Sequence, residues 1–297
     1  MYLPAQESRQ ALDAERLRAE LTAPRGPLGR VDWAAQTGST NTDLAEAASR
    51  DPDAWPDLSL LTVEAQQSGK GRLERPWKTP VGGALAISLV LRPSGVPVDS
   101  LAWLSMLSAV AVCRTLRPAG VDAWIKWPND VLAVDAAGQA KKICGILAQL
   151  VLLPGRDPAV VLGTGINVSQ DRAELPTETS TSLLVEGSRI LDRNILLQEY
   201  VRNFTAGYQR FVAAGGNPQR QSEGFPALAQ EVASMMLTLG QQVRAELPDG
   251  SYRYGRASGI DAQGALLITD PEGTSVAVSA ADVVHLRRAD AQGIGYA

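Results

Sequence analysis

Apolar side chains recur along the chain at two spacings, one typical of helices and the other of strands. Leu12, Leu17 and Leu21 lie among Ala, Glu and Arg, which predicts a short amphipathic helix over residues 8–21. Prolines and glycines between positions 24 and 29 end this helix. Downstream, alternating or continuous apolar runs predict strands. These strands cover residues 58–63, 85–91, 124–127, 131–134, 143–152 and 160–168.

Helical spacing returns between and after these strands. The predicted helices cover residues 42–49, 100–116, 192–214 and 226–236. Asp99 or Ser100 suits the N-cap of the second helix, and Pro226 suits the first turn of the last one. Strands interleaved with helices predict a mixed β-sheet with flanking helices, and hence an α/β or α+β domain over residues 30–236. Residues 1–29 form a helical extension in this scheme.

The pattern changes after residue 236. Short strands are predicted at 243–247, 252–258, 265–269 and 275–278, and turns containing Gly separate them. Regular spacing of short strands is typical of a small all-β barrel, here of about 60 residues. We therefore expect residues 237–297 to form a second domain.

Composition narrows the classes of function. The 297 residues carry a formal net charge of −4, which argues against a chain built mainly to grip nucleic acid. Residues 1–29 are too few for a winged helix-turn-helix. Two cysteines without motif spacing indicate a reducing compartment, and the single histidine, His285, excludes a multi-histidine metal centre. We see no secretory signal and no apolar run long enough for a membrane span, so a cytoplasmic location is expected.

One stretch, residues 66–78, is strongly basic within this acidic chain. It carries Lys70, Arg72, Arg75 and Lys78 against one acid, Glu74. Gly69 and Gly71 allow backbone N–H groups to turn toward a ligand, and arginines pair well with phosphate oxygens. The stretch matches neither a Walker A loop nor a dinucleotide Gly-x-Gly-x-x-Gly motif. A phosphate-binding loop and a solvated surface loop fit this composition equally well.

Four further segments combine polar residues with unusual backbone requirements. Lys-Trp-Pro-Asn-Asp at 126–130 suits either a proline turn or phosphate and magnesium contacts, and Lys142 begins an otherwise apolar strand. Gly163-Thr-Gly165-Ile-Asn167 ends a strand, as either a bulge or a close approach to a ligand. At 37–41, Thr-Gly-Ser-Thr-Asn precedes a helix, where Ser39 or Thr40 is an N-cap or a hydrogen-bonding group for a small ligand.

Taken in order, these five segments resemble the biotin protein ligase family, closely over residues 31–168 and more loosely beyond. The basic loop of that family reads Gly-Arg-Gly-Arg-x-Gly-Arg-x-Trp. Here residues 69–77 read Gly-Lys-Gly-Arg-Leu-Glu-Arg-Pro-Trp, so Lys70 replaces an arginine and Glu74 replaces the third glycine. The Lys-Trp-Pro-Asn-Asp, Lys-x-x-Gly-Ile-Leu and Gly-x-Gly-Ile-Asn patterns are intact.

The resemblance implies roles for individual residues. Ser39, Thr40 and Gln66 would bond the ureido group of biotin, and Lys70, Gly71 and Arg72 would line the biotin carboxylate and the α-phosphate. Lys142 would hold the carboxylate and the adenylate phosphate, so that Arg72 and Lys142 are the catalytic candidates. The remaining implied binding residues are Asn41, Gly69, Arg75, Trp77 beside the adenine, Lys126, Asn129, Gly163, Gly165, Asn167, and, in the C-terminal domain, Asp282 and Arg287 near the nucleotide.

The implied fold is a biotin/lipoate ligase-like catalytic domain followed by an SH3-like barrel. The implied reaction joins biotin to ATP as biotinyl-5′-adenylate and transfers biotin to a lysine of a biotin carboxyl carrier protein, with Mg²⁺ as cofactor and no side chain assigned as metal ligand. The resemblance is compatible with a homodimer; no DNA or membrane partner is expected. A lipoate–protein ligase, a non-catalytic biotin sensor and a transcriptional regulator remain alternatives.

Overall fold

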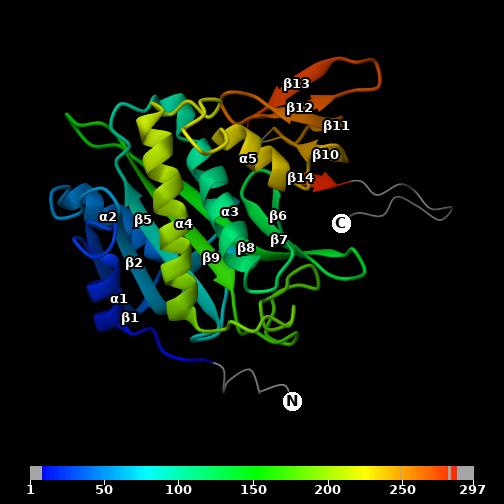
Figure 1. The fold of residues 1–297 in the computed structure, drawn as a ribbon. Helices are drawn as coiled ribbons and strands as arrows, with labels where there is room; N and C mark the ends of the chain where they lie inside the picture. Colours follow the sequence, from blue (N-terminus) through cyan, green and yellow to red (C-terminus); the bar gives the residue numbers. More distant parts are fainter. Residues whose placement is uncertain (1–8, 248, 280–281, 286–297) are drawn as a thin grey trace.

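The computed structural model describes residues 9–247, 249–279 and 282–285. Its main body is a seven-stranded mixed sheet in the order β1-β2-β5-β9-β8-β7-β6 (Figure 1). Only the pair β1 and β2 is parallel, and the other neighbours are antiparallel. The strands are β1 (Arg30–Thr37), β2 (Ser59–Gln66), β5 (Ala84–Leu91), β6 (Ala123–Lys126), β7 (Asp130–Val134), β8 (Ala140–Val151) and β9 (Ala159–Asn167).

Helices cover both faces of this sheet, because alternate residues of its central strands point in opposite directions. Val160 and Leu162 of β9 belong to the larger core, beneath α3 (Trp103–Leu116) and α4 (Arg193–Ala213). Val161, between them, packs with Leu44 of α2 (Thr40–Arg50) in a separate cluster on the opposite face. Figure 1 shows α3 and α4 side by side across the front of the sheet. This explains why β5 and β9 read as nearly continuous apolar runs.

Most predicted elements of the main body are confirmed, but strand β1 was not predicted, and the remaining errors lie mainly at helix starts. Asp192, the first residue of the predicted helix, is the N-cap of α4: its carboxylate accepts a hydrogen bond from the Asn194 N–H at 2.8 Å. The predicted caps of α3 are wrong: residues Val98–Ser100 form a separate 3-10 turn, and α3 begins at Trp103. Pro226 is likewise outside α5 (Leu228–Met235), and α1 (Ala14–Leu21) begins only after its cap Asp13. Proline has no backbone N–H and therefore fits both in the first turn of a helix and just before it, so the sequence does not distinguish these two positions.

The C-terminal strands form a second, five-stranded antiparallel sheet in the order β13-β12-β11-β10-β14. Four strands were predicted; the fifth, β14, pairs with β10 and has only two valines as an apolar signal. Within the described residues the edge strands β13 and β14 are not paired with each other, so this small sheet is open. The bounds are β10 (Gln242–Glu246), β11 (Tyr252–Ile260), β12 (Leu266–Thr269), β13 (Ser275–Val278) and β14 (Asp282–His285).

Two tryptophans join the small sheet to the main body. The Trp127 indole, 1% exposed, donates to the Gly264 carbonyl at 3.0 Å, and the Trp103 indole donates to the Ala262 carbonyl at 2.8 Å. The Trp127 backbone N–H also donates to the Thr238 hydroxyl at 3.0 Å. Buried indoles satisfied in this way contribute both apolar area and a directional bond. Trp127 of the Lys-Trp-Pro-Asn-Asp motif therefore has a structural role.

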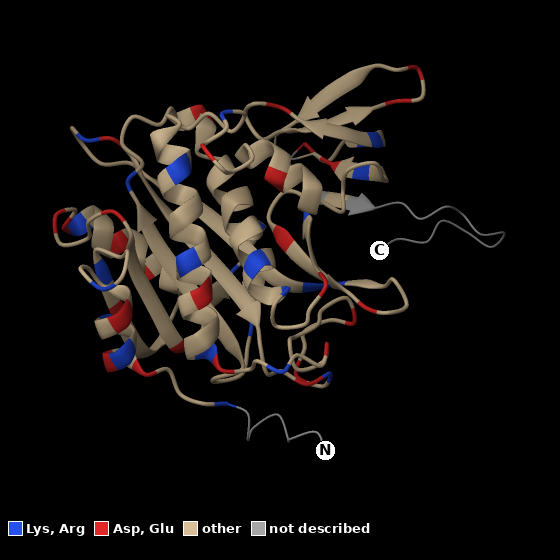
Figure 2. Ribbon diagram, in the orientation of Figure 1, with Lys and Arg blue, Asp and Glu red and all other residues tan. Residues whose placement is uncertain are grey.

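Charged residues lie mainly on helices and loops, and the long strands carry few (Figure 2). Contrary to the expectation from sequence, the stretch Val98–Leu116 is long and apolar enough to cross a membrane by length and composition. Of the residues in this stretch, 67% are buried inside the protein, and those of α3 pack against α4 and the sheet. Burial of this kind is that of a core helix.

A buried ion pair ties the N-terminal segment to the sheet. Arg193, whose side chain is 2% exposed, contacts the Glu64 carboxylate of β2 at 2.5 Å. The same guanidinium donates to the Gln10 carbonyl at 2.7 Å, and Glu64 accepts from the Leu12 N–H at 2.5 Å. Each buried charge thus has several partners, which a buried ion pair requires.

We predict that Arg193→Met strongly destabilises the fold, because the Glu64 carboxylate would stay buried without its counter-charge. Breaking such a pair costs about 3–5 kcal/mol of unfolding free energy. Urea unfolding would measure it. Arg202→Met on the same helix is the control, since Arg202 is 70% exposed and pairs with Glu199 at the surface; it should change stability by less than about 0.5 kcal/mol. Equal effects of the two variants would contradict this assignment.

Candidate active site

A cavity of about 320 Å³ lies at the junction of β8, β9, the start of α2 and the loop after β2. It brings together most of the residues singled out by sequence. Of these, the lining includes Ser39, Thr40, Asn41, Gln66, Lys70, Gly71, Arg72, Arg75, Trp77, Asn129, Lys142, Gly163 and Gly165. Segments from five separate parts of the sequence therefore converge on one space, of the size of small-molecule sites.

The basic stretch folds as a β-hairpin beside this cavity. Strand β3 (Gly69–Lys70) pairs with β4 (Pro76–Trp77), and a 3-10 turn over Arg72–Glu74 forms the tip. The Gly71 N–H donates to the Arg75 carbonyl at 2.8 Å, which closes the tip. Across the cavity, the Arg72 guanidinium donates to the Asn129 side-chain oxygen at 3.3 Å. The stretch is therefore an ordered flap over the cavity.

Residues at the N-terminus of α2 form a hydrogen-bonded polar wall of the cavity. Ser39 is the N-cap residue, but its side chain does not cap the helix. Instead, the Gln66 side-chain oxygen accepts from the Thr40 N–H at 2.9 Å and from the Thr40 hydroxyl at 3.1 Å. A buried hydroxyl, Ser88, lies 2.8 Å from the Thr40 hydroxyl and 2.6 Å from the Asn41 side-chain oxygen. These groups orient one another, so the wall is preorganised for a polar ligand.

Three glycines on β8 and β9 leave the sheet bare of side chains next to the cavity. A Cβ on Gly163 would lie 2.3 Å from the Asn41 side-chain oxygen, and one on Gly165 would lie 2.8 Å from the Trp77 ring. Gly145 pairs with Gly165 across the two strands and faces the same ring. In this structure the groups that approach these glycines are the side chains of Asn41 and Trp77. A close approach to a ligand stays a prediction.

Lys142 reaches the cavity from β8. Its ammonium contacts the Asp130 carboxylate at 2.7 Å and lies 5.9 Å from the centre of the Trp77 ring. The cavity lining holds four cationic side chains, Lys70, Arg72, Arg75 and Lys142, against one carboxylate, Asp130. This local excess of positive charge, within a chain of net charge −4, favours an anionic ligand.

Three of the predicted binding residues that the structure describes do not line the cavity. Lys126 ends β6, the far edge strand, and Gly69 lies at the hairpin base, where a Cβ would meet the Trp77 carbonyl at 2.6 Å. Asn167 is buried, donating to the Thr181 carbonyl at 2.9 Å and accepting from Gln170 at 3.1 Å. Arg287 lies outside the described residues, and Asp282 is placed only as the first residue of β14.

Other residues of the site were not predicted. Ser88 does not line the cavity but supports its polar wall from behind through Thr40 and Asn41. It is the one hydroxyl in the otherwise apolar strand β5, and that contrast is its only signal. The loop after β9 contributes Pro176, Thr177, Thr179 and Ser180. Its position is set by backbone bonds to Lys142, whose N–H donates to the Thr179 carbonyl at 2.8 Å and whose carbonyl accepts from the Thr181 N–H at 2.8 Å. Hydroxyl-rich loops are common at surfaces, so composition did not mark this one.

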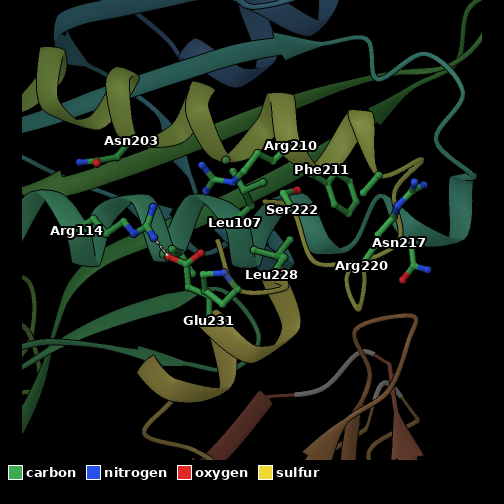
Figure 3. Close-up of a pocket in the computed structure, with 14 residues that line it drawn as sticks. Leu107, Arg114, Asn203, Arg210, Phe211, Asn217, Arg220, Ser222, Leu228 and Glu231 are labelled. Carbon is green, nitrogen blue, oxygen red and sulfur yellow. Dashed lines mark ion pairs between the residues drawn. The ribbon is translucent and has the colours of Figure 1, made fainter. Parts of the chain in front are cut away.

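A second, much smaller cavity of about 30 Å³ lies between α3, α4 and α5. Figure 3 shows the Arg114 guanidinium paired with the Glu231 carboxylate at its wall, with Arg210 nearby. Burial lowers the pKa of Arg210, and its guanidinium stacks 4.2 Å from the Phe225 ring. Such a space holds one or two waters. These contacts fasten α5 to the main body, so the larger cavity is the candidate active site.

Within the described residues no group of three or more His, Cys, Asp or Glu side chains could hold a metal ion. Burial raises the pKa of both thiols, Cys113 to about 12 and Cys144 well above its usual value. Both cysteines are buried and free. The chemistry available in the cavity is thus binding and stabilisation of anions by fixed positive charge and hydrogen bonds, without a thiol nucleophile.

Comparisons with known proteins place this site in a family. The profile of the Biotin/lipoate A/B protein ligase family matches residues 33–167, and that of the Biotin protein ligase C terminal domain matches residues 238–286. The biotin–[acetyl-CoA-carboxylase] ligase of Mycobacterium tuberculosis is 37% identical over 283 residues, covering 94% of this chain and 97% of that protein. The bifunctional ligase/repressor BirA of Bacillus subtilis is 32% identical over 229 residues, covering 76% of this chain and 66% of that protein.

Solved structures agree on the fold. The biotin protein ligase of Aquifex aeolicus in complex with biotin and ATP has a TM-score of 0.68 at 23% identity, covering 87% of this chain and all of that one. The Leishmania major biotin protein ligase with biotinyl-5-AMP has a TM-score of 0.54 at 14% identity, covering 86% of this chain and all of that one. Together with the cation-lined cavity, these similarities show that the chain belongs to the biotin protein ligase family.

Proposed function

We propose that this chain activates biotin with ATP and transfers the biotinyl group to a lysine of a biotin carboxyl carrier protein. One observation carries the proposal: four cations and a preorganised hydrogen-bonding wall surround a single cavity under an ordered basic flap. Biotin offers both an anionic carboxylate and a polar ureido group, which matches these two kinds of lining. The first step joins two anions, and such a step depends on fixed positive charge.

In the first step, a carboxylate oxygen of biotin attacks the α-phosphorus of ATP and pyrophosphate leaves. Lys142 and Arg72 oppose the negative charge that gathers on the phosphoryl oxygens. The Asp130 carboxylate, 2.7 Å from the Lys142 ammonium, holds this side chain in place before the ligands arrive. Thr40, Gln66 and Asn41 fix the uncharged end of biotin, so that the carboxylate points toward the cations. Orientation and charge stabilisation are the main contributions of the protein.

In the second step, the amine of the acceptor lysine attacks the carbonyl carbon of the mixed anhydride and AMP leaves with the bond electrons. The amine gives up one proton, to a phosphate oxygen of the departing AMP or to water, as the amide forms. Neither step requires a nucleophile from this chain, which suits a site whose described part lacks a reactive thiol or histidine. Water would hydrolyse the anhydride, so the flap over residues 69–77 also has a protective role.

The cavity fits Mg²⁺ that enters with ATP. Magnesium in such sites is held by one or two carboxylates and by substrate phosphates, and Asp130 and Asn129 lie in the lining. These two residues would hold the ion, which supplies charge neutralisation of the phosphate chain. The Trp77 ring, stacked over Gly145 and Gly165, is available to the adenine.

Biotin-dependent exchange of pyrophosphate into ATP tests the proposal directly. Exchange with biotin and transfer to a carrier protein are the expected results. Exchange with lipoate instead would favour the lipoate alternative, and biotin binding without exchange would favour a sensor. A DNA shift assay examines the regulatory alternative, for which the described N-terminal part offers only the single helix α1. We also place the protein in the cytoplasm, to be checked by fractionation.

A homodimer is part of the proposal because one strand edge is open. Beyond Gly145, β8 has no partner strand on the side of β7 within the described residues. Leu150 and Leu152, at the end of this stretch, are 46% and 75% exposed. An open edge with apolar side chains favours pairing with another strand. Sedimentation of the intact protein should show a dimer that Leu152→Glu weakens, and an unchanged association would remove the edge from consideration.

We predict that Lys142→Met lowers the rate of adenylate formation by about 100- to 1000-fold, the usual effect of removing one charge-stabilising donor. Lys141→Met is the matched control, since Lys141 is the adjacent residue of β8 and does not line the cavity. Single-turnover formation of biotinyl-adenylate would measure both variants. A loss shared equally by both lysines would indicate damage to the strand and contradict the assigned role.

Arg72→Gly should slow adenylation and release the intermediate faster, because it removes a cation and the contact between the flap and Asn129. The loss of a charged hydrogen bond predicts about a tenfold or larger rise in the dissociation rate. Release of labelled biotinyl-adenylate would be timed in this variant and in Arg156→Gly. Arg156 lies on an exposed loop and pairs with Asp53, so its variant should match the wild type. Unchanged release and rate in Arg72→Gly would refute the idea.

A further inference from the structure

The tip of the basic hairpin contains two adjacent residues in the left-handed region of backbone conformation. Leu73 has φ of +54° and Glu74 has φ of +57°, and neither is glycine. Such conformations are costly for residues with a side chain and persist only where surrounding contacts hold them. Both side chains are largely exposed: Leu73 is 73% exposed and the Glu74 side chain is 79% exposed. Packing of these side chains therefore does not explain the conformation.

Glu74 instead makes one specific contact. Its carboxylate lies 2.9 Å from the ammonium of Lys70, four residues earlier, at the other side of the hairpin tip. Lys70 lines the cavity, whereas neither Leu73 nor Glu74 does. The left-handed backbone thus turns the carboxylate of an exposed residue back toward a cation of the binding site. A ligand anion that takes this cation must displace the carboxylate.

We propose that Glu74 is a positioning residue for the reaction, which holds the Lys70 ammonium and competes with the phosphate chain of ATP for it. This inference rests on the proposed function, because it takes ATP as the anionic ligand. The contact therefore sets the affinity for ATP. The carboxylate weakens binding of ATP to the flap, and it keeps the Lys70 side chain ordered while the cavity is empty. Exposed ion pairs of this kind are weak, so the competition is modest and falls with ionic strength.

The competition predicts an effect on KM and little effect on kcat. Glu74→Gln keeps the size of the side chain and removes the competing charge, so KM for ATP should fall by about 1.5- to 5-fold, with kcat changed less than about twofold. The readout is the rate of biotin-dependent pyrophosphate–ATP exchange as ATP is varied. The gain should shrink at high salt. Glu20→Gln is the matched control, because Glu20 forms an exposed ion pair of the same spacing with Arg16 at 3.0 Å.

A double-mutant cycle separates this mechanism from simple repulsion between Glu74 and ATP. Lys70→Met should raise KM for ATP, and Glu74→Gln added to Lys70→Met should give no further gain. A gain of the same size in both backgrounds would show repulsion through space and overturn the inference. An unchanged KM in Glu74→Gln alone would overturn it as well.

Backbone strain requires its own variant. Leu73→Gly relieves one left-handed residue and keeps the ion pair, so it should not reproduce the fall in KM seen with Glu74→Gln. If it does, the conformation of the tip, and not the charge of Glu74, sets ATP binding. The failure of the proposed function is distinguishable from all of these results, because wild-type protein would then show no biotin-dependent exchange.

Discussion

A patch of sheet that carries no side chains is the constraint on which the site depends. Gly145 and Gly165 face each other across β8 and β9, and Gly163 lies two residues before Gly165 on the same strand. Any Cβ at 163 or 165 would fall within 3 Å of Asn41 or Trp77. Glycine weakens a strand interior, and long pairing along β9 with both β5 and β8 offsets this weakness. The bare patch lets the polar wall from α2 and the ring from the hairpin meet the sheet.

The second requirement is a concentration of positive charge that stays in place without a ligand. Lys70, Arg72 and Lys142 each have a partner in the structure: Glu74, Asn129 and Asp130 respectively. Such partners reduce the repulsion between neighbouring cations and fix their side chains. They are also groups that an anionic ligand must displace or share, so affinity is set by the difference between the two sets of contacts. Glu74, which replaces the glycine of the family pattern, changes this difference because it adds an internal partner for Lys70.

The third feature is the connection between the site and the rest of the molecule. Trp127 stands beside Asn129 and Asp130 in sequence and anchors the small sheet through Gly264 and Thr238. Thr164, between the two cavity glycines, lies 2.9 Å from the hydroxyls of Ser108 and Tyr200 in the buried core. Burial raises the pKa of Tyr200, which therefore keeps its proton and stays a hydrogen-bond donor. Residues adjacent in sequence to the binding groups thus fasten those groups to the small sheet on one side and to the helices α3 and α4 on the other.

The sequence alone determined most helices and strands of this protein and many residues of its site. Apolar periodicity indicates which positions are buried, and short motifs indicate where the backbone must adopt a special conformation. The strand run at 85–91, the long helix at 192–214 and the convergence of Arg72, Asn129 and Lys142 all followed from local pattern or from family resemblance. Positions decided by long-range packing did not. Lys126 and Asn167 belong to recognised motifs, yet neither lines the cavity. Lys126 ends the edge strand β6, opposite Asp130, and the side chain of Asn167 is taken up by the Thr181 carbonyl and Gln170. Ser88 supports the polar wall only because the sheet brings β5 against Thr40 and Asn41, and the loop 176–180 enters the cavity because the backbone of Lys142 holds it. The conformation of Glu74 was likewise beyond the sequence: a charged residue at a left-handed position depends on the closed hairpin and on Lys70, which only the tertiary structure brings beside it.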